Sequence, residues 1–216
     1  MITRLGERLK TETRALHVRA ERSPFMAALL RGRLARGAYI GLLHNLHAIY
    51  GALEPALRLH AAHPALAPLD LTALARLQPL LDDLAALHGP SASATAPWLE
   101  VATARYVQRL NDIASTQPEL LLAHAYVRYL GDLNGGQVLR RIVAASLQLA
   151  PGVGVAFYDF GEPALVAAQA GAFRIGLDAA EVGDADAVVG EARLAFELHC
   201  QLFAELALAH GVPGQS

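Results

Sequence analysis

The stretch from residue 124 to residue 141 constrains the fold most, because it combines a helical pattern of apolar residues with three glycines. Gly131 and Gly135 lie four residues apart and share one face of a helix, and Gly136 adjoins them. Each glycine inside a helix costs about 0.8 to 1 kcal/mol relative to alanine. A kink, a close helix crossing or a flat ligand against the bare backbone offsets such a cost. The glycines alone leave helix packing and ligand binding equally open.

Polar side chains border this glycine face. Arg128 and Asp132 lie one helical turn apart, which is the spacing of an ion pair on one helix face. Tyr126 and Tyr129 bring hydroxyl groups to the same region. The sequence therefore predicts a bare groove with a polar margin.

The composition predicts an all-α fold with a single domain. The chain has 216 residues, of which 54% are hydrophobic, and this is sufficient for a substantial core. Most of the hydrophobic residues are Ala and Leu, which favour helices over strands. We expect one domain over 1–216, with an ordered core from about 5 to 210.

Apolar periodicity predicts where the helices lie. The central helix begins at Pro118, bends at the glycines and continues to Leu149. Residues 89–97 are assigned to a loop by composition, and 155–160 are also assigned to a loop because a single strand would have no partner. A short helix follows Ser23-Pro24, and the other predicted helices cover 5–22, 36–62, 71–88, 98–115, 163–180 and 184–210.

Charge and cysteine content exclude several classes of protein. The net charge is only -2, which gives no argument for binding nucleic acid or an acidic membrane surface. The single cysteine, Cys200, excludes an internal disulfide and fits a reducing compartment, and we expect it to be a small buried hydrophobe. The charged first residues are unlike a signal peptide, and no long apolar run occurs. We therefore expect a cytoplasmic protein without a membrane anchor, and a monomer by default.

His17 is the histidine whose neighbours indicate a metal ligand. Glu21 follows by four residues, so its carboxylate can accept a hydrogen bond from Nδ1 and leave Nε2 free to bind a metal. Lys10 lies two turns earlier on the same face, roughly 10 Å along the helix axis. This separation is of the order of that between a heme iron and a propionate. For the other histidines we expect ordinary surface or core roles: His44, His47, His60, His63, His88, His124, His199 and His210.

Other metal and catalytic classes lack their motifs. A di-iron carboxylate bundle needs paired Glu-x-x-His motifs, and no glutamate in this chain has a histidine at that spacing. Zinc sites need clustered cysteines and histidines, and a helical hydrolase needs a nucleophile placed beside a base. Heme explains the features together, because a porphyrin is flat, apolar on both faces and anionic at one edge. A heme site needs an axial imidazole below the porphyrin, smooth backbone above it and cations at its edge. His17, the glycine face, and Lys10 with Arg174 match these needs.

Two separated motifs resemble those of the heme oxygenase family. YVRYLGDLNGGQ at 126–137 is similar to the distal-helix signature of that family, and LKTETRALHVRAE at 9–21 is similar to its proximal helix. The similarity extends through 39–54 and 118–141 and, more weakly, to the last helix. It implies a helical bundle of the heme oxygenase type, with heme between the proximal helix and a kinked distal helix.

The resemblance implies that heme is both cofactor and substrate. The enzyme would use O₂ and externally supplied electrons to cleave heme to biliverdin, releasing carbon monoxide and ferrous iron. In the proximal helix, His17 would be the axial iron ligand, held by Glu21. In the distal helix, Gly131 and Gly135 would let the backbone approach the oxygen molecule.

The resemblance also implies roles for the polar residues. Asp132 would hold a water that delivers protons, and it would be oriented by Arg128 and a hydrogen-bond network near Tyr50. Three residues would contact the heme propionates: Lys10, Tyr126 and Arg174.

Two positions depart from the family pattern. Asn134 stands where the signature often has serine, and Ala170 stands where a lysine is expected, one turn before Arg174. Loss of that lysine removes one propionate contact, and such contacts decide which meso carbon faces the oxygen. We expect attack at the α position, the family default.

Two other functions stay open at this point. A heme-binding carrier or sensor would hold heme without degrading it, although storage alone needs no carboxylate beside the glycines. A helical interaction protein would use the glycines for packing only. If the chain is an enzyme, its electrons come from a separate reductase or ferredoxin, since the sequence has no flavin or iron-sulfur motif.

Overall fold

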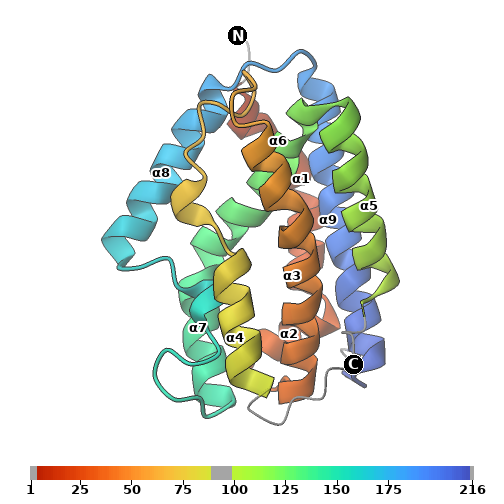
Figure 1. The fold of residues 1–216 in the computed structure, drawn as a ribbon. Coiled ribbons are helices and arrows are strands. Elements are labelled where there is room, and N and C mark those ends of the chain that lie inside the picture. Colours follow the sequence, from red (N-terminus) through yellow and green to blue (C-terminus); the bar gives the residue numbers. More distant parts are fainter. Residues whose placement is uncertain (1–3, 89–98, 215–216) are drawn as a thin grey trace.

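The computed structural model describes residues 4–88 and 99–214 (Figure 1). These residues form helices and turns without any strand, so the predicted all-α fold is confirmed. Short 3-10 turns connect some helices: η1 (Thr72–Leu74), η2 (Pro118–Leu120) and η4 (Ala156–Tyr158). The α-helices are α1 (Leu5–Glu21), α2 (Pro24–Leu30), α3 (Arg36–Leu59), α4 (Leu77–His88), α5 (Val101–Thr116), α6 (Leu121–Ala125), α7 (Gly131–Ser146), α8 (Pro163–Ala179) and α9 (Ala185–Ala209).

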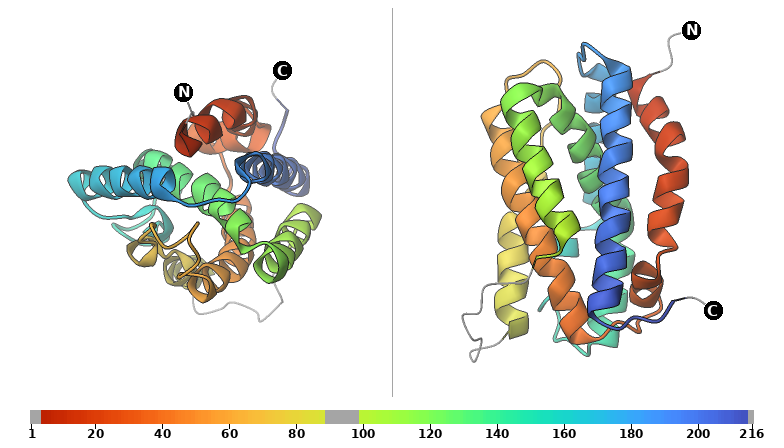
Figure 2. Two further views of the ribbon diagram at one scale, coloured as in Figure 1. Left: turned by 90° about the horizontal axis from the view of Figure 1, so that it is seen from above. Right: turned by 90° about the vertical axis from the view of Figure 1, so that its right-hand side faces the viewer.

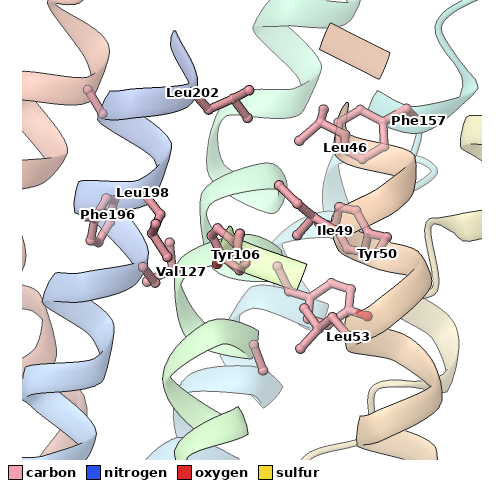
Figure 3. Close-up of a cluster of buried hydrophobic side chains, with 14 of the residues drawn as sticks. Leu46, Ile49, Tyr50, Leu53, Tyr106, Val127, Phe157, Phe196, Leu198 and Leu202 are labelled. Carbon is pink, nitrogen blue, oxygen red and sulfur yellow. The ribbon is translucent and has the colours of Figure 1, made fainter. Parts of the chain in front are cut away.

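The long helices α3, α5 and α9 pack side by side, and α1 packs against α9 (Figures 1 and 2). The segment from α6 to α7, here called the central segment, runs through the middle of the bundle. Figure 3 shows Tyr50 of α3, Tyr106 of α5 and Leu198 of α9 in the core with Val127 of the central segment. All four side chains are buried. The core therefore holds the central segment in place from several sides.

Capping residues fix the starts of two helices that pack together, α2 and α9. Ser23 accepts a hydrogen bond from the backbone N–H of Met26 at 3.3 Å, and proline follows it at the first helical position. Asp184 accepts hydrogen bonds from the N–H groups of Asp186 and Ala187, at 2.9 and 3.0 Å. These caps match the predicted starts of both helices within one residue.

The central segment changes its helix type directly before its glycines. It is α-helical to Ala125, forms a π-helical segment η3 over Tyr126–Leu130, and becomes α-helical again at Gly131. A π turn holds one more residue than an α turn and is frequent at functional sites. This irregularity lies directly before Gly131, in the helix that the sequence predicted to bend. The helix ends at Ser146, whereas the prediction placed its end at Leu149.

Other predicted boundaries also needed correction. The helix predicted from 71 begins at Leu77, because the preceding residues form η1 and the Arg76 guanidinium bonds two carbonyl oxygens of the chain just before it. The helices predicted over 36–62 and 98–115 end at Leu59 and begin at Val101, respectively. Cys200, predicted to be buried, is half-buried and accepts a hydrogen bond from Arg19 Nε at 3.4 Å.

The two predicted loops have different outcomes. The segment 155–160 contains η4 and no strand, as predicted, and Asp83 holds it by accepting the N–H groups of Ala156 and Phe157 at 2.7 and 2.8 Å. The loop predicted over 89–97 lies outside the described residues. Within 4–88 and 99–214, no helix combines the length and the hydropathy that crossing a bilayer requires.

Candidate functional site

A cavity of about 640 Å³ lies between α1 and the central segment, and residues of α8 and α9 complete its walls. Pockets for small molecules measure roughly 300 to 1,000 Å³. His17 and Lys10 of α1, Tyr126 of η3 and Arg174 of α8 all line it, so four of the predicted ligand residues meet here. The remaining lining residues are Arg4, Gly6, Glu7, Thr13, Arg14, Leu130, Asn134, Leu177, Asp178 and Phe196.

His17 stands on the α1 wall with its two ring nitrogens in different surroundings. Nδ1 lies 3.6 Å from Oε2 of Glu21, one turn further along the helix. Its ring meets Phe196 edge to face, with the ring centroids 5.7 Å apart. Because Nδ1 is directed at the carboxylate, Nε2 is the nitrogen available to a ligand. The predicted i, i+4 proximity is present, but at 3.6 Å the predicted hydrogen bond is not formed.

The glycines of the central segment divide into two kinds. A Cβ added to Gly136 would lie 3.2 Å from the carbonyl oxygen of Tyr158, so close packing explains this glycine. A Cβ added to Gly131 or Gly135 would have no neighbouring atom within 4 Å beyond the helix's own nearby backbone. Packing therefore does not account for Gly131 or Gly135. Both lie next in sequence to residues that line the cavity, Leu130 and Asn134.

Cations and hydrogen-bonding groups stand along the cavity wall. Arg174 Nη2 donates to Oδ1 of Asn134 at 3.2 Å, which links α8 to the central segment. Burial raises the pKa of the Tyr126 hydroxyl, while Thr13 and Arg174 oppose that rise, so Tyr126 is a neutral hydrogen-bond donor. Ala170, at the position where the family pattern has lysine, is only 5% exposed. Ala170 does not line the cavity, and this position supplies no cation to it.

Asp132 does not line the cavity but belongs to a buried network behind it. Arg128 Nη2 donates to both carboxylate oxygens, at 3.0 and 3.1 Å, and the Tyr50 hydroxyl donates to Oδ2. The side chains of Arg128 and Asp132 are 10% and 12% exposed. Burial raises the pKa of Asp132, and the charge of Arg128 and the Tyr50 hydrogen bond oppose this. The predicted pairing of Arg128 with Asp132 is present, and Tyr50 joins it as expected.

His199 also belongs to this network, which the sequence did not indicate. Arg128 Nη1 and His199 Nε2 are 2.8 Å apart, and His199 Nδ1 lies 2.9 Å from the carbonyl oxygen of Ala195. Burial and the Arg128 charge lower the pKa of His199 to about 3. The helical period of α9 places position 199 on its buried face, but this signal does not distinguish a core histidine from a site residue.

A second polar cluster links α5, α6 and α9. His124 meets the Tyr106 hydroxyl through Nδ1 and Glu191 through Nε2, both at 2.9 Å. Arg109 donates to both oxygens of Glu191, at 3.0 and 2.6 Å. Burial disfavours the Glu191 carboxylate, but these hydrogen bonds outweigh it and lower its pKa to about 2. His124 thus has the core role expected from the sequence.

The fold and the site together define a class of protein. An all-helical bundle holds a cavity with an available imidazole on one wall, unpacked glycines beside residues of another, and cations at its margin. This is a site for a flat ligand with apolar faces, an anionic edge and an atom that binds nitrogen. A sequence model described as heme oxygenase matches residues 3–205, and the chain belongs to the heme oxygenase family.

Individual relatives agree with this assignment. Heme oxygenase 1 of Nostoc sp. is 35% identical over 213 residues, covering 95% of this chain and 87% of the relative. Human heme oxygenase 1 is 38% identical over 218 residues, covering 98% of this chain and 75% of the relative. The crystal structure of heme oxygenase-2 from Synechocystis sp. in complex with heme and NO is 35% identical, with a TM-score of 0.89 over 96% of this chain and 86% of that one. The heme oxygenase structure from Leptospira interrogans has a TM-score of 0.88 at 34% identity, over 94% of this chain and all of that one.

Proposed function

We propose that this heme oxygenase binds and cleaves its substrate in the cavity between α1 and the central segment. The overall reaction opens heme to biliverdin with O₂ and externally supplied electrons, releasing carbon monoxide and ferrous iron. One observation carries the assignment of the site: the available imidazole of His17 and the residues flanking the unpacked Gly131 and Gly135 line the same cavity. Bound heme supplies the iron at which O₂ reacts and is also the molecule that is consumed.

The proximal side fixes the substrate. His17 would bind the heme iron through Nε2, and Glu21 would accept a hydrogen bond from Nδ1. Such a bond fixes the ring tautomer and orientation and raises the basicity of the ligand. Phe196 packs edge to face against the imidazole and would limit rotation of the ring.

The distal side controls what can approach the reacting face. Gly131 and Gly135 have no Cβ, so the backbone of the central segment can lie closer to the substrate than any other residue would allow. A close wall of this kind excludes bulk water and restricts the direction from which O₂ can react. Glycine also has no side chain that could itself bind the iron.

Asp132 would deliver protons by holding a water molecule at the cavity side of its carboxylate. Arg128 and Tyr50 already donate to this carboxylate, so its plane is fixed while its position stays buried. A fixed carboxylate orients a water well, and the water transfers the protons that ring opening consumes. Arg128 and Asp132 are therefore proposed as catalytic residues together with the two glycines.

The cavity rim would orient the macrocycle. Lys10 and Arg174 offer cations to the propionates, and the Tyr126 hydroxyl offers a hydrogen bond. Ala170 supplies no cation, so Arg174 is the positive charge proposed for that part of α8. We propose attack at the α-meso carbon, with the substrate held by the remaining contacts.

A single experiment tests this function. The purified protein is titrated with hemin, a reductant is added in air, and the absorption spectrum is followed to the product. Decay of the Soret band with growth of a bilin band is expected, and chromatography then identifies the meso carbon that was attacked. A Soret band that persists after confirmed reduction and exposure to oxygen would instead fit a heme carrier or sensor.

Electrons for this reaction would come from a separate reductase or ferredoxin. The cytoplasmic location and the monomeric state remain predictions from the sequence. Sedimentation of the heme-loaded protein measures its oligomeric state directly.

A further inference from the structure

We infer that His199 is a positioning residue for the Asp132 carboxylate, acting through Arg128 as a neutral hydrogen-bond acceptor. The inference rests on the proposed function, because it assigns a role to a neighbour of the residue that would deliver protons. His199 lies on α9, far in sequence from the glycine motif, and it is 3% exposed.

The two hydrogen bonds of His199 define its tautomer. A carbonyl oxygen can only accept, so Nδ1 carries the proton that points at Ala195. A guanidinium can only donate, so Nε2 presents its lone pair to Arg128. One neutral form satisfies both contacts, whereas a charged imidazole would place an N–H against a cation. The lowered pKa of His199 also favours the neutral imidazole that this geometry requires.

The acceptor at position 199 fixes both arms of the Arg128 fork. Nη1 donates to His199, and Nη2 donates to the two oxygens of Asp132. With only Nη2 held, the guanidinium could turn about its long axis and take the carboxylate with it. The Tyr50 hydroxyl then completes the set from α3. Residues from four elements, α9, η3, α7 and α3, thereby hold the Asp132 carboxylate in one orientation.

Of the two buried histidines in this region, His199 is the one that contacts Arg128. The Tyr106 ring of α5 meets the imidazole edge to face at 5.1 Å. His124 of α6 is equally buried, but it bonds Tyr106 and Glu191 and not Arg128. His124 is therefore a matched control, since its removal also deletes a buried histidine with two hydrogen bonds.

Three variants separate positioning from simple stability: His199→Leu, His199→Gln and His124→Leu. The glutamine side chain carries an oxygen near the position of Nε2, so it can still accept from Arg128. For each variant, hemin affinity is measured, together with the yield of biliverdin and of hydrogen peroxide per electron supplied. On the heme-free wild-type protein, nitrogen-15 NMR of the imidazoles reports which ring nitrogen of His199 carries the proton, with His199→Gln used to assign the signal.

His199→Leu is expected to keep its hemin affinity but to lose about tenfold to a hundredfold in biliverdin formation, with electrons diverted to hydrogen peroxide. His199→Gln should stay within about threefold of wild type, and so should His124→Leu, even though both are less stable. NMR should show a protonated Nδ1 and a bare Nε2 from pH 8 to pH 5. A proton on Nε2, or a charged ring at pH 7, would overturn the inference.

Equal biliverdin yield from folded His199→Leu and wild type would also overturn it. If His199→Leu does not fold, a yield from His199→Gln as low as that of an Asp132 variant has the same meaning. A wild-type protein that forms no biliverdin would reject the proposed function instead, and the NMR result on the heme-free protein would still decide the tautomer.

Discussion

The His17 Nδ1 atom lies 3.6 Å from the nearer carboxylate oxygen of Glu21, and both side chains are about half exposed. The spacing is longer than a hydrogen bond, so a small rotation of either side chain is needed to form one. Binding of a metal at Nε2 increases the acidity of the Nδ1 proton and strengthens such a contact. The pair is therefore arranged to tighten when the site is filled.

Replacement of His17 tests the proximal side. His17→Ala should change the heme absorption spectrum and lose most turnover, because no other imidazole lines the cavity within the described residues. Glu21→Ala should keep the ligand and lose about tenfold in activity, as outer-shell partners of metal ligands generally do. Absorption spectroscopy of the hemin complexes checks both. An unchanged spectrum for His17→Ala would exclude it as the ligand.

Asp132→Ala tests the proton-delivering carboxylate. The variant should bind hemin normally, since Asp132 does not line the cavity, but should lose about a hundredfold or more in ring opening. Asp178→Asn is the control, because Asp178 lines the cavity but takes no part in the Arg128 network. Biliverdin yield measures the effect. A normal yield from Asp132→Ala would remove this residue from the mechanism.

The two kinds of glycine give opposite predictions for stability. Gly135→Ala should stabilise the heme-free protein by up to about 1 kcal/mol, because its Cβ meets no atom and alanine favours helix. Its biliverdin formation should nevertheless fall about tenfold or more, since a methyl group would stand on the reacting face. Thermal unfolding and product yield are measured on the same samples, and unchanged activity would mean that this face does not approach the substrate.

Gly136→Ala is the matched comparison. Its Cβ would lie 3.2 Å from the Tyr158 carbonyl oxygen, in a turn that Asp83 holds through two backbone N–H groups. The carbonyl cannot easily move, so this variant should unfold at a lower temperature than wild type. A melting temperature above that of Gly135→Ala would contradict the packing assigned to the two positions.

The buried histidines make stability depend on pH. The pKa of His199 is lowered from its ordinary value of 6.5 to about 3, so as the pH falls the unfolded chain binds the proton first. The free energy of unfolding should therefore be constant above about pH 7 and decrease between pH 6.5 and 3, by up to about 1.4 kcal/mol per pH unit for each such histidine. His124, whose pKa burial also lowers, adds to the slope. Urea unfolding at several pH values measures this dependence of the unfolding free energy on pH. In His199→Gln the slope should correspond to about one proton fewer taken up on unfolding.

Spacing and resemblance predicted the residues that act within one helix or belong to one motif. His17 with Glu21 and Arg128 with Asp132 are i, i+4 pairs, and the structure retains both. His199 meets Arg128 across 71 positions of sequence, and no local pattern reports a contact made only by tertiary packing. The start of α4 was missed for a similar reason, since the Arg76 side chain bonds the Leu74 carbonyl oxygen, which a longer helix would pair with the Gln78 N–H.

The π-helical segment η3 has a consequence for helix phase. An α-helix turns about 100° per residue, and a π turn takes up one residue more than an α turn. Residues after Leu130 are therefore rotated by about 100° relative to an uninterrupted continuation of α6. Deletion of one residue within Tyr126–Leu130 would restore a regular α-helix and rotate Gly131 and Gly135 to a different direction around the helix axis. The number of residues in η3 therefore determines the direction in which Gly131 and Gly135 face.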